Sequence, residues 1–259
     1  MYEPIKRFRK RLENGETLVG TTIVVTDPIA TDAIAESVDF LWFDLEHTSM
    51  SHEALRNHLI AARGKGCPGI VRVTQGSTAF VKPVLDAGAS GVIAPQIRTV
   101  TEVEQLVADC RYTPMGERGV GPLIPTNYTK VPIPQQVEQS NSNILTAIMI
   151  ETAESVEIID EIVAVPGLDS IVIGPMDLSG SLGVLGNLEH PEVVNAMNRV
   201  ISSATDAGVY VGAGLGLDAS YGLTLANRGV KWLQMGCDIL AMIDGINKSV
   251  TDLRDLLEQ

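Results

Sequence analysis

The stretch Ala147-Ile148-Met149-Ile150-Glu151-Thr152 decides the fold class, together with a second stretch, Ile171-Val172-Ile173-Gly174-Pro175-Met176-Asp177-Leu178. Each begins with a short apolar run, as expected of a strand buried on both faces, and continues to a carboxylate. Asp177 follows Glu151 by 26 residues, which leaves room for one helix between two parallel strands. We therefore expect Glu151 and Asp177 to leave the same edge of a parallel sheet side by side.

A pair of carboxylates at one edge points to a bound cation. Neighbouring negative charges are costly unless positive charge lies between them, which favours a hard divalent ion. Because the ligands are oxygen atoms, Mg²⁺, Mn²⁺ and Co²⁺ are all suitable. Each acid taken alone has a second interpretation, as a solvated loop residue or a helix N-cap.

The same alternation of strand and helix extends along the whole chain. Strands are expected at 18–25, 39–44, 68–73, 91–95, 147–151, 171–177, 209–214 and 231–236. Helices are expected at 4–14, 29–37, 53–64, 78–87, 101–110, 157–165, 191–207, 219–227 and 238–257. Eight repeats of strand and helix predict an α/β fold, a (β/α)8 TIM barrel, with an extra N-terminal helix. No change of composition marks a second domain, so residues 1–259 are expected to form one.

Residues 111–143 interrupt the alternation of strands and helices, because they are rich in Pro, Gly, Gln and Asn. A connection of this length in a compact domain is usually functional. We expect a lid or an interface segment, with a short helix near 134–140.

Composition excludes several classes of partner. The net charge of −13 disfavours binding to nucleic acid or to an anionic membrane. The basic run Lys6-Arg7-Phe8-Arg9-Lys10-Arg11 lies on the N-terminal helix and is interpreted as a solvated face. No uncharged apolar stretch reaches the ~18 residues of a membrane span, and the N-terminus lacks a signal-peptide pattern. We therefore expect a soluble, cytoplasmic protein.

The three cysteines, Cys67, Cys110 and Cys237, are widely spaced and form no Cys-x-x-Cys pair. This spacing does not match a metal site or a disulfide framework. They are interpreted as buried small apolar residues in a reducing compartment.

Ionisable residues gather where the predicted strands end, which is where barrel enzymes place their active sites. Asp44-Leu45-Glu46-His47 follows the second strand, and Arg72 lies in the third. His47 is the only histidine in such a place, so we interpret it as an acid/base catalyst, although a structural role is the alternative. Arg72 needs a carboxylate partner, which is Asp44 or Glu46, or else the carboxylate or enolate of a substrate.

The glycine-rich stretch Gly212-Ala213-Gly214-Leu215-Gly216 follows the seventh strand. Barrels often bind phosphate at this position, but the stretch lacks the full phosphate-binding pattern. We place Leu215 among the substrate-binding residues.

Taken together, these residues resemble the HpcH/HpaI aldolase family from the first strand to the last helix. The resemblance also rests on Leu85-Asp86-Ala87-Gly88-Ala89, Arg111-Tyr112-x-Pro114-x-Gly116-x-Arg118-Gly119-Val120-Gly121 and Gly174-Pro175-x-Asp177-Leu178-Ser179. It implies a metal-dependent (class II) pyruvate aldolase on a (β/α)8 barrel. It also implies a homo-oligomer, generally a hexamer, in which the last helix packs across a subunit interface.

The resemblance implies roles for residues on the fifth and sixth strands. Glu151 and Asp177 match the metal ligands of the family, and the backbone around Met176 and Asp177 matches the site that receives the pyruvate carboxylate. Two departures are visible: Met149 stands where relatives commonly have Gln, and Met176 replaces a common Ala. By strand alternation Met149 faces the same interior as Glu151, so we expect an altered acceptor choice or an altered reaction.

The resemblance also implies roles on the second, third and fourth repeats. Arg72 matches the arginine that binds pyruvate and stabilises its enolate, and His47 and Asp86 match an acid/base dyad. Asp44 matches an acid near the acceptor pocket.

The expected reaction is reversible aldol cleavage of a 4-hydroxy-2-oxo acid, such as 4-hydroxy-2-oxoheptanedioate, to pyruvate and an aldehyde through a metal-stabilised enolate. One alternative keeps enolate chemistry but changes the bond, as in oxaloacetate decarboxylation or citrate-lyase-type cleavage of a CoA ester. The overall acidity disfavours binding of the CoA phosphates. Another alternative is a non-catalytic, metabolite-binding barrel.

Overall fold

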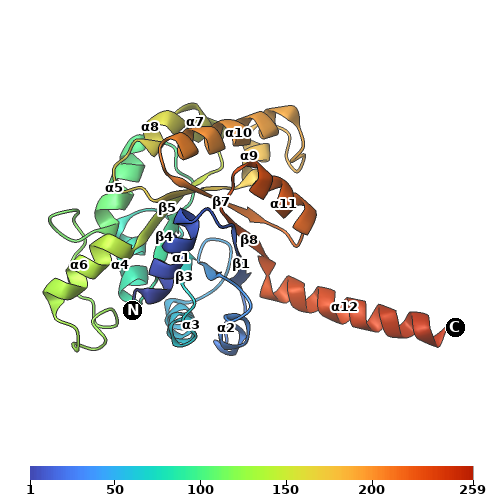
Figure 1. Ribbon diagram of the computed structural model, residues 1–259, viewed down its shortest axis with the longest axis horizontal. Helices are drawn as coiled ribbons and strands as arrows, with labels where there is room; N and C mark the ends of the chain where they lie inside the picture. The colour runs from blue at the N-terminus through green and yellow to red at the C-terminus, as the bar shows by residue number, and fades with distance from the viewer. Residues whose placement is uncertain (259) are drawn as a thin grey trace.

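The computed structural model describes residues 1–258. Eight parallel strands close into a barrel in chain order, which confirms the predicted fold (Figure 1). They are β1 (Leu18–Ile23), β2 (Phe40–Asp44), β3 (Gly69–Arg72), β4 (Gly91–Ala94), β5 (Leu145–Ile150), β6 (Ser170–Ile173), β7 (Tyr210–Leu215) and β8 (Trp232–Cys237). Every residue of β2, β4, β5 and β6 is buried, as their unbroken apolar runs predict.

The strands are covered by helices that follow them along the chain. They are α1 (Glu3–Glu13), α2 (Ile29–Ile34), α3 (His52–Gly64), α4 (Thr78–Asp86), α5 (Val100–Cys110), α6 (Ile133–Asn143), α7 (Ala153–Glu157), α8 (Ile159–Val163), α9 (Pro175–Ser181), α10 (Pro191–Asp206), α11 (Ala219–Arg228) and α12 (Asp238–Leu257). Several begin at caps that the sequence supplies. Ser51 caps α3, and Thr99 forms a capping box with Glu102 at the start of α5.

Two predicted helices have other bounds in the structure, and one helix was not predicted. The helix expected at 157–165 is two short helices, α7 and α8, and it starts earlier because Thr152 caps the chain directly after the fifth strand. The short helix near 134–140 extends over Ile133–Asn143. The sequence also did not predict α9, which Pro175 opens at its first position.

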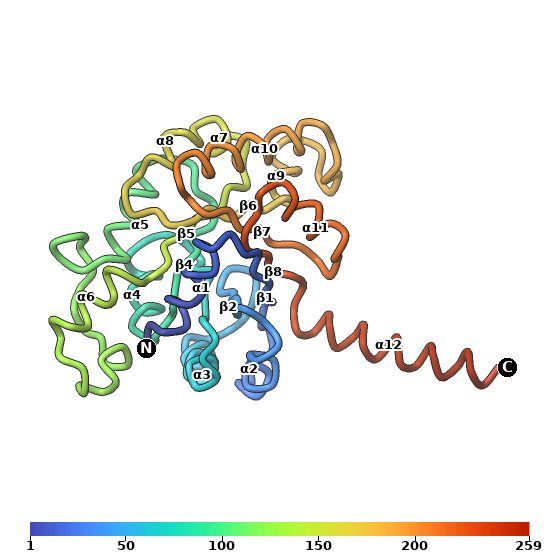
Figure 2. Tube along the Cα trace, viewed as in Figure 1, coloured from blue at the N-terminus to red at the C-terminus, as the bar shows by residue number. Residues whose placement is uncertain are grey.

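Helix α1 closes one mouth of the barrel, and Figure 2 shows it crossing in front of the strands. Phe8 packs edge-on against Phe40 and Trp232, with ring centroids 5.6 and 6.2 Å away. Both partners stand at the first residues of their strands. A substrate must therefore enter from the opposite mouth, where the strands end.

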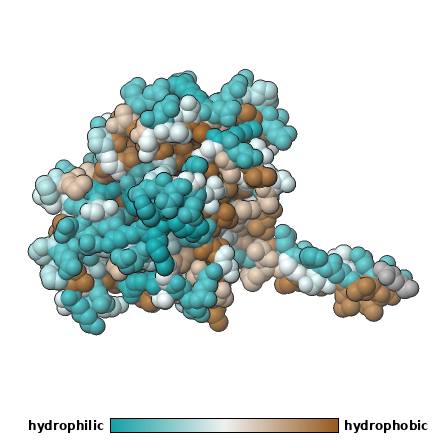
Figure 3. All heavy atoms as spheres, in the orientation of Figure 1, coloured by the Kyte–Doolittle hydropathy of each residue, from teal (hydrophilic) through white to brown (hydrophobic). Residues whose placement is uncertain are grey.

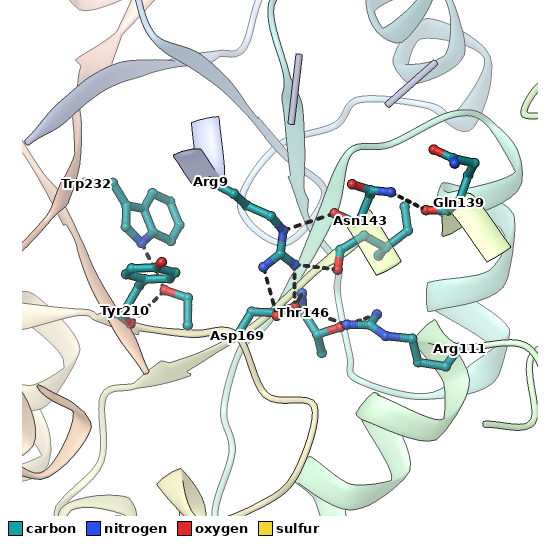
Figure 4. Close-up of polar contacts among 10 residues, drawn as sticks. Arg9, Arg111, Gln139, Asn143, Thr146, Asp169, Tyr210 and Trp232 are labelled. Atoms are coloured by element: carbon teal, nitrogen blue, oxygen red, sulfur yellow. Dashed lines mark hydrogen bonds and ion pairs between the residues drawn. The ribbon is translucent and has the colours of Figure 1, made fainter. Parts of the chain in front are cut away.

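A polar network centred on Asp169 fastens this closed end (Figure 4). Its carboxylate accepts hydrogen bonds from Arg9 Nη1 at 3.0 Å, Arg111 Nη2 at 3.1 Å and the Thr146 backbone N–H at 2.8 Å. Arg9 also donates to the backbone carbonyl of Ile144 at 2.9 Å. The interpretation of the basic run as a solvated face is thus wrong for Arg9, whose side chain is 19% exposed.

All three cysteines are free thiols. Cys67 and Cys110 are buried as predicted, and burial raises their pKa to about 12 and about 11. Cys237 is only half-buried.

Over residues 1–258, no helix has the length and apolar character needed to cross a bilayer.

Helix α12, predicted with its observed bounds, extends away from the barrel as an arm (Figure 1). Asp238 is its one buried residue; the carboxylate accepts hydrogen bonds from the backbone N–H groups of Val24 and Val25 and fixes the root of the arm. Large apolar side chains are exposed along the rest, and Figure 3 shows them gathered toward its outer end. We call one face of the arm the apolar stripe: Ile239, Met242, Ile243, Ile246, Val250, Leu253 and Leu257.

Candidate active site

Arg72 occupies the last position of β3, directly beside Asp44 at the end of β2. Its Nε donates to Asp44 Oδ1 at 2.9 Å and its Nη2 to Asp44 Oδ2 at 2.6 Å. Its Nη1 lies 3.1 Å from Glu46 Oε2, and the guanidinium stands 5.5 Å from the Trp42 ring centroid. Both carboxylate partners considered from the sequence are therefore present. Together they fix the plane of the guanidinium.

Burial alone would lower the pKa of Arg72, but the hydrogen bonds to Asp44 and the negative charges of Asp44 and Glu46 outweigh it and raise the pKa. Arg72 is thus a permanent cation at the wall of the cavity. Asp44 was expected near the acceptor pocket; the structure places it, 4% exposed, as the bidentate partner of Arg72.

Glu151 follows the last residue of β5 and is 2% exposed. Its Oε1 accepts a hydrogen bond from the backbone N–H of Gln96 at 2.7 Å, while its buried Oε2 has no partner. A Cβ at Gly174 would lie 3.1 Å from this Oε2, so the free oxygen faces the end of β6. An unpaired buried carboxylate oxygen is costly, which indicates that something outside the described chain satisfies it.

The charges around Glu151 also indicate that its carboxylate needs a positively charged partner. Burial raises its pKa, and the nearby negative charges of Glu46 and Asp177 raise it further. Burial likewise raises the pKa of Glu46, and the charge of Asp177 adds to this effect. Unfavourable interactions between neighbouring negative charges are the electrostatic setting that favours a cation.

Asp177 lies in the first turn of α9 and is exposed at the cavity wall. Across residues 1–258, no three His, Cys, Asp or Glu side chains are close enough together to form a complete metal site. Glu151 and Asp177, the two ligands expected from the sequence, follow β5 and β6 at the same rim of the barrel. This fits a hard divalent cation, which is commonly held by one or two carboxylates and completed by water and substrate oxygens.

The cavity has a volume of about 650 Å³ and opens at the ends of the strands. Its inner wall includes Arg72, Met149, Gly174, Met176 and Asp177. Its outer wall comes from the chain before α10 and from the end of β7, including Leu215. Met149 is 4% exposed, and its sulfur lies 3.5 Å from Arg72 Nη1. It therefore contacts the guanidinium that the substrate would meet.

His47 and Asp86 do not meet within one chain. The His47 side chain is 65% exposed beside Glu46, with Nε2 3.7 Å from Glu46 Oε2. Asp86 ends α4, so it lies at the barrel end where β4 begins, and it pairs with Arg118 at 2.6 Å. A helix that follows a parallel strand returns the chain to the opposite rim. The expected dyad is thus not formed inside a single barrel.

Residues 111–143 contribute none of the cavity's lining, so the expected lid over this site is not observed in the single chain. Sequence reasoning also missed Gln96, whose backbone has φ 58° and whose N–H orients Glu151. Left-handed backbone in a non-glycine residue is costly and concentrates at functional sites. The available signal was its position directly after Pro95, beyond the end of the fourth strand.

The closed barrel and the cavity at its open rim define a (β/α)8-barrel enzyme. Residues 25–245 match the HpcH/HpaI aldolase/citrate lyase family, and the chain belongs to this family. It is a carbon–carbon lyase.

Individual relatives match over nearly their full length. A hydroxypyruvate/pyruvate aldolase from Pseudomonas aeruginosa is 32% identical over 98% of this chain and 92% of its own. A 2-keto-3-deoxy-L-rhamnonate aldolase from Salmonella gallinarum is 30% identical over 93% of this chain and 90% of its own. The crystal structure of an HpcH/HpaI aldolase from Desulfitobacterium hafniense matches with a TM-score of 0.89 and 32% identity, over 95% of this chain and 96% of that one.

Proposed function

We propose that the protein catalyses the reversible aldol cleavage of a 4-hydroxy-2-oxo acid to pyruvate and an aldehyde. The observation that carries this proposal is the free, buried Oε2 of Glu151, a carboxylate that the negative charge of Asp177 affects, at the rim where Arg72 and Asp177 line a cavity. The names of the two aldolase relatives support pyruvate as the common product.

In this proposal Glu151 and Asp177 hold a divalent cation, either Mg²⁺, Mn²⁺ or Co²⁺. When bound, the ion supplies Lewis acidity to the 2-oxo group of the substrate. The backbone N–H of Gln96 keeps Glu151 Oε1 in place, so that Oε2 is directed to the end of β6. The chain thus presents its ligands before the substrate arrives.

Arg72 binds the oxygen on which negative charge develops when the C3–C4 bond breaks. Asp44 holds Nε and Nη2, so the guanidinium cannot rotate away, and Nη1 remains on the side of Glu46 and Met149. A fixed donor of this kind costs no reorganisation during the reaction. Glu46 Oε2 lies 3.1 Å from Nη1, and the Met149 sulfur accepts only a weak contact, so the Nη1 hydrogen on the side of Met149 can be donated to the substrate.

His47 removes the proton of the 4-hydroxyl group in cleavage, and the electron pair of the broken C3–C4 bond passes into the enolate. The enolate takes up a proton from solvent at C3 to give pyruvate, and synthesis follows the same steps in reverse. The exposed ring of His47 stands at the rim, where a proton can be exchanged with solvent. Asp86 lies at the other end of the same barrel, so an Asp86–His47 pair requires a second copy of the chain.

Pyruvate release provides the direct test of this function. We expect the metal-free enzyme, prepared with EDTA, to lose turnover of 4-hydroxy-2-oxo acids and to regain it with Mg²⁺, Mn²⁺ or Co²⁺. The same preparations should exchange the methyl protons of pyruvate for solvent deuterium only with metal present, as seen by proton NMR. Turnover and exchange that are indifferent to EDTA contradict the proposed mechanism.

The exposed apolar stripe of α12 supports a homo-oligomer, and we propose a hexamer in which α12 packs against another subunit. Apolar residues spaced three and four apart form one face, and such a large exposed apolar face is typical of an interaction surface. Replacing Ile246 by aspartate is expected to dissociate the assembly to monomers, because it buries an unpaired charge.

Light scattering coupled to size exclusion measures this effect. Thr251→Asp adds the same charge on the opposite face of α12 and should leave the assembly intact. A monomeric wild-type protein, or an Ile246→Asp variant of unchanged mass, argues against the proposed interface.

A further inference from the structure

The outer half of the cavity carries negative charge from two separate loops. Glu189 lies in the loop before α10, and Asp218 lies between β7 and α11; both side chains line the cavity and both residues are exposed. Tyr221 lines the same cavity, and its pKa is raised by burial and by the charge of Glu189, against the opposing charge of Arg228. Two acids therefore border the path that an incoming aldehyde takes.

Within residues 1–258, no cation that lines the cavity balances these acids, and Arg228, whose positive charge lowers the pKa of Tyr221, is not part of the lining. Among the residues that the structure describes, Arg72 is the one cation lining the cavity, and Asp44 and Glu46 already pair with it. Deeper in the site, Glu151 and Asp177 offset a divalent ion. A second anionic group on the acceptor aldehyde would thus meet repulsion with no positive partner.

The start of α11 does not offer an anion site either. Barrels often use a helix N-terminus near the seventh strand to bind phosphate. Here Asp218 is the N-cap and its Oδ1 accepts a hydrogen bond from the Tyr221 backbone N–H at 2.9 Å. Its carboxylate occupies the position that a phosphate would take. This disfavours the phosphate alternative for the glycine-rich stretch that ends β7.

The wall does offer uncharged hydrogen-bonding groups. Thr22, Asn187 and Gln234 line the cavity, and carboxylates accept hydrogen bonds from hydroxyl groups. The Gln234 amide is held by its donation to the carbonyl of Gly236, which fixes its orientation. A site with several polar groups rejects an analogue that leaves them unpaired.

We propose that the acceptor is an uncharged, hydroxylated aldehyde, and that Glu189 and Asp218 exclude aldehydes that carry a carboxylate or a phosphate. This inference rests on the proposed aldolase function. It names the class of acceptor that the chain selects and the residues that impose the selection.

The test compares acceptors in the synthetic direction, with pyruvate as donor and the metal-loaded, full-length enzyme. D-glyceraldehyde is the hydroxylated neutral probe, propanal the apolar one, and succinic semialdehyde and D-glyceraldehyde 3-phosphate are the anionic ones. We expect kcat/KM for D-glyceraldehyde to exceed that for either anionic probe by roughly tenfold or more, and to exceed that for propanal. An anionic acceptor or propanal used as well as D-glyceraldehyde overturns the inference.

Two variants assign the effect to the named acids. Glu189→Gln and Asp218→Asn remove charge with little change of shape, and asparagine can still cap α11. Each should raise the ratio of kcat/KM for succinic semialdehyde to that for D-glyceraldehyde about three- to fourfold at low salt, and less at high salt. Glu104→Gln, on the exposed face of α5, is the matched control and should not change the ratio. Unchanged ratios in both site variants overturn the assignment.

Failure of the proposed function remains distinguishable from failure of this inference. Metal-dependent deuterium exchange into pyruvate needs no acceptor. Without that exchange, the aldolase proposal and this inference both fall. With exchange present and an anionic acceptor preferred, only the acceptor class is wrong.

Discussion

Replacing Glu151 by glutamine is expected to abolish metal-dependent turnover and, at the same time, to raise the thermal stability of the metal-free protein. Glu151 is buried, its Oε2 has no hydrogen-bond partner, and burial raises its pKa. A glutamine keeps an oxygen for the Gln96 N–H but carries no charge, so the folded chain no longer contains that costly group. Because we propose Glu151 as a metal ligand, its loss would remove the site that polarises the substrate, and we expect a roughly thousandfold fall in kcat/KM.

The two readouts separate function from folding. Each 1 kcal/mol gained raises Tm by about 2 to 4 °C in a chain of this size, and titration calorimetry with Mn²⁺ measures the lost affinity. Glu154→Gln is the matched control, because the Glu154 side chain is 59% exposed on α7 and lies 3.7 Å from Arg98 in an exposed ion pair. A Glu151→Gln variant that binds Mn²⁺ with unchanged affinity would show that Glu151 is a structural acid.

The barrel could be predicted from the sequence because most of its strands are continuous apolar runs, which are stable only when both faces are buried. A run such as Leu145–Ile150 has no polar face, so it must be covered on both sides, and repeated alternation with helices leaves few architectures. Short helices were harder to predict from the sequence than the strands. The helix α9 has only seven residues and starts at Pro175, within a stretch that the sequence assigned to the end of a strand.

The positions of the expected site residues were predicted correctly where strand geometry alone decides them. Arg72, Glu151 and Asp177 lie at or just beyond strand ends, and parallel strands deliver such positions to one rim. Asp86 shows the limit of this reasoning. It carries a motif resemblance but sits at the end of a helix, and the fold takes that position to the other rim.

Contacts between segments far apart in the chain also could not be predicted from the sequence. The backbone N–H of Gln96 orients Glu151 across 55 positions of chain, and no periodic pattern encodes that bond. Asp169 likewise forms ion pairs with Arg9 and Arg111, which are distant in the sequence, at the closed end of the barrel. Such pairings depend on the register of the closed sheet, which becomes visible only when all eight strands are placed.

The second large effect is expected for Arg72→Lys, which keeps the charge but removes the planar fork. Lysine cannot make the two parallel hydrogen bonds to Asp44 and also present a fixed donor to the substrate. We expect kcat/KM to fall about 100- to 1,000-fold, the range seen when one donor to a developing oxyanion is removed. If the lost interaction forms only in the transition state, kcat falls as much as kcat/KM while KM stays constant.

Stability measurements distinguish this role from a purely structural one. Arg72→Ala leaves Asp44 and Glu46 without their shared cation, so it should lower the free energy of unfolding by about 3 to 5 kcal/mol. Arg72→Lys retains the charge and should lose much less, although its activity falls. Arg98→Lys, at an exposed ion pair with Glu154, should change neither quantity. An Arg72→Lys enzyme with wild-type kcat would mean that Arg72 serves only to neutralise Asp44 and Glu46, and that enolate stabilisation comes from elsewhere in the site.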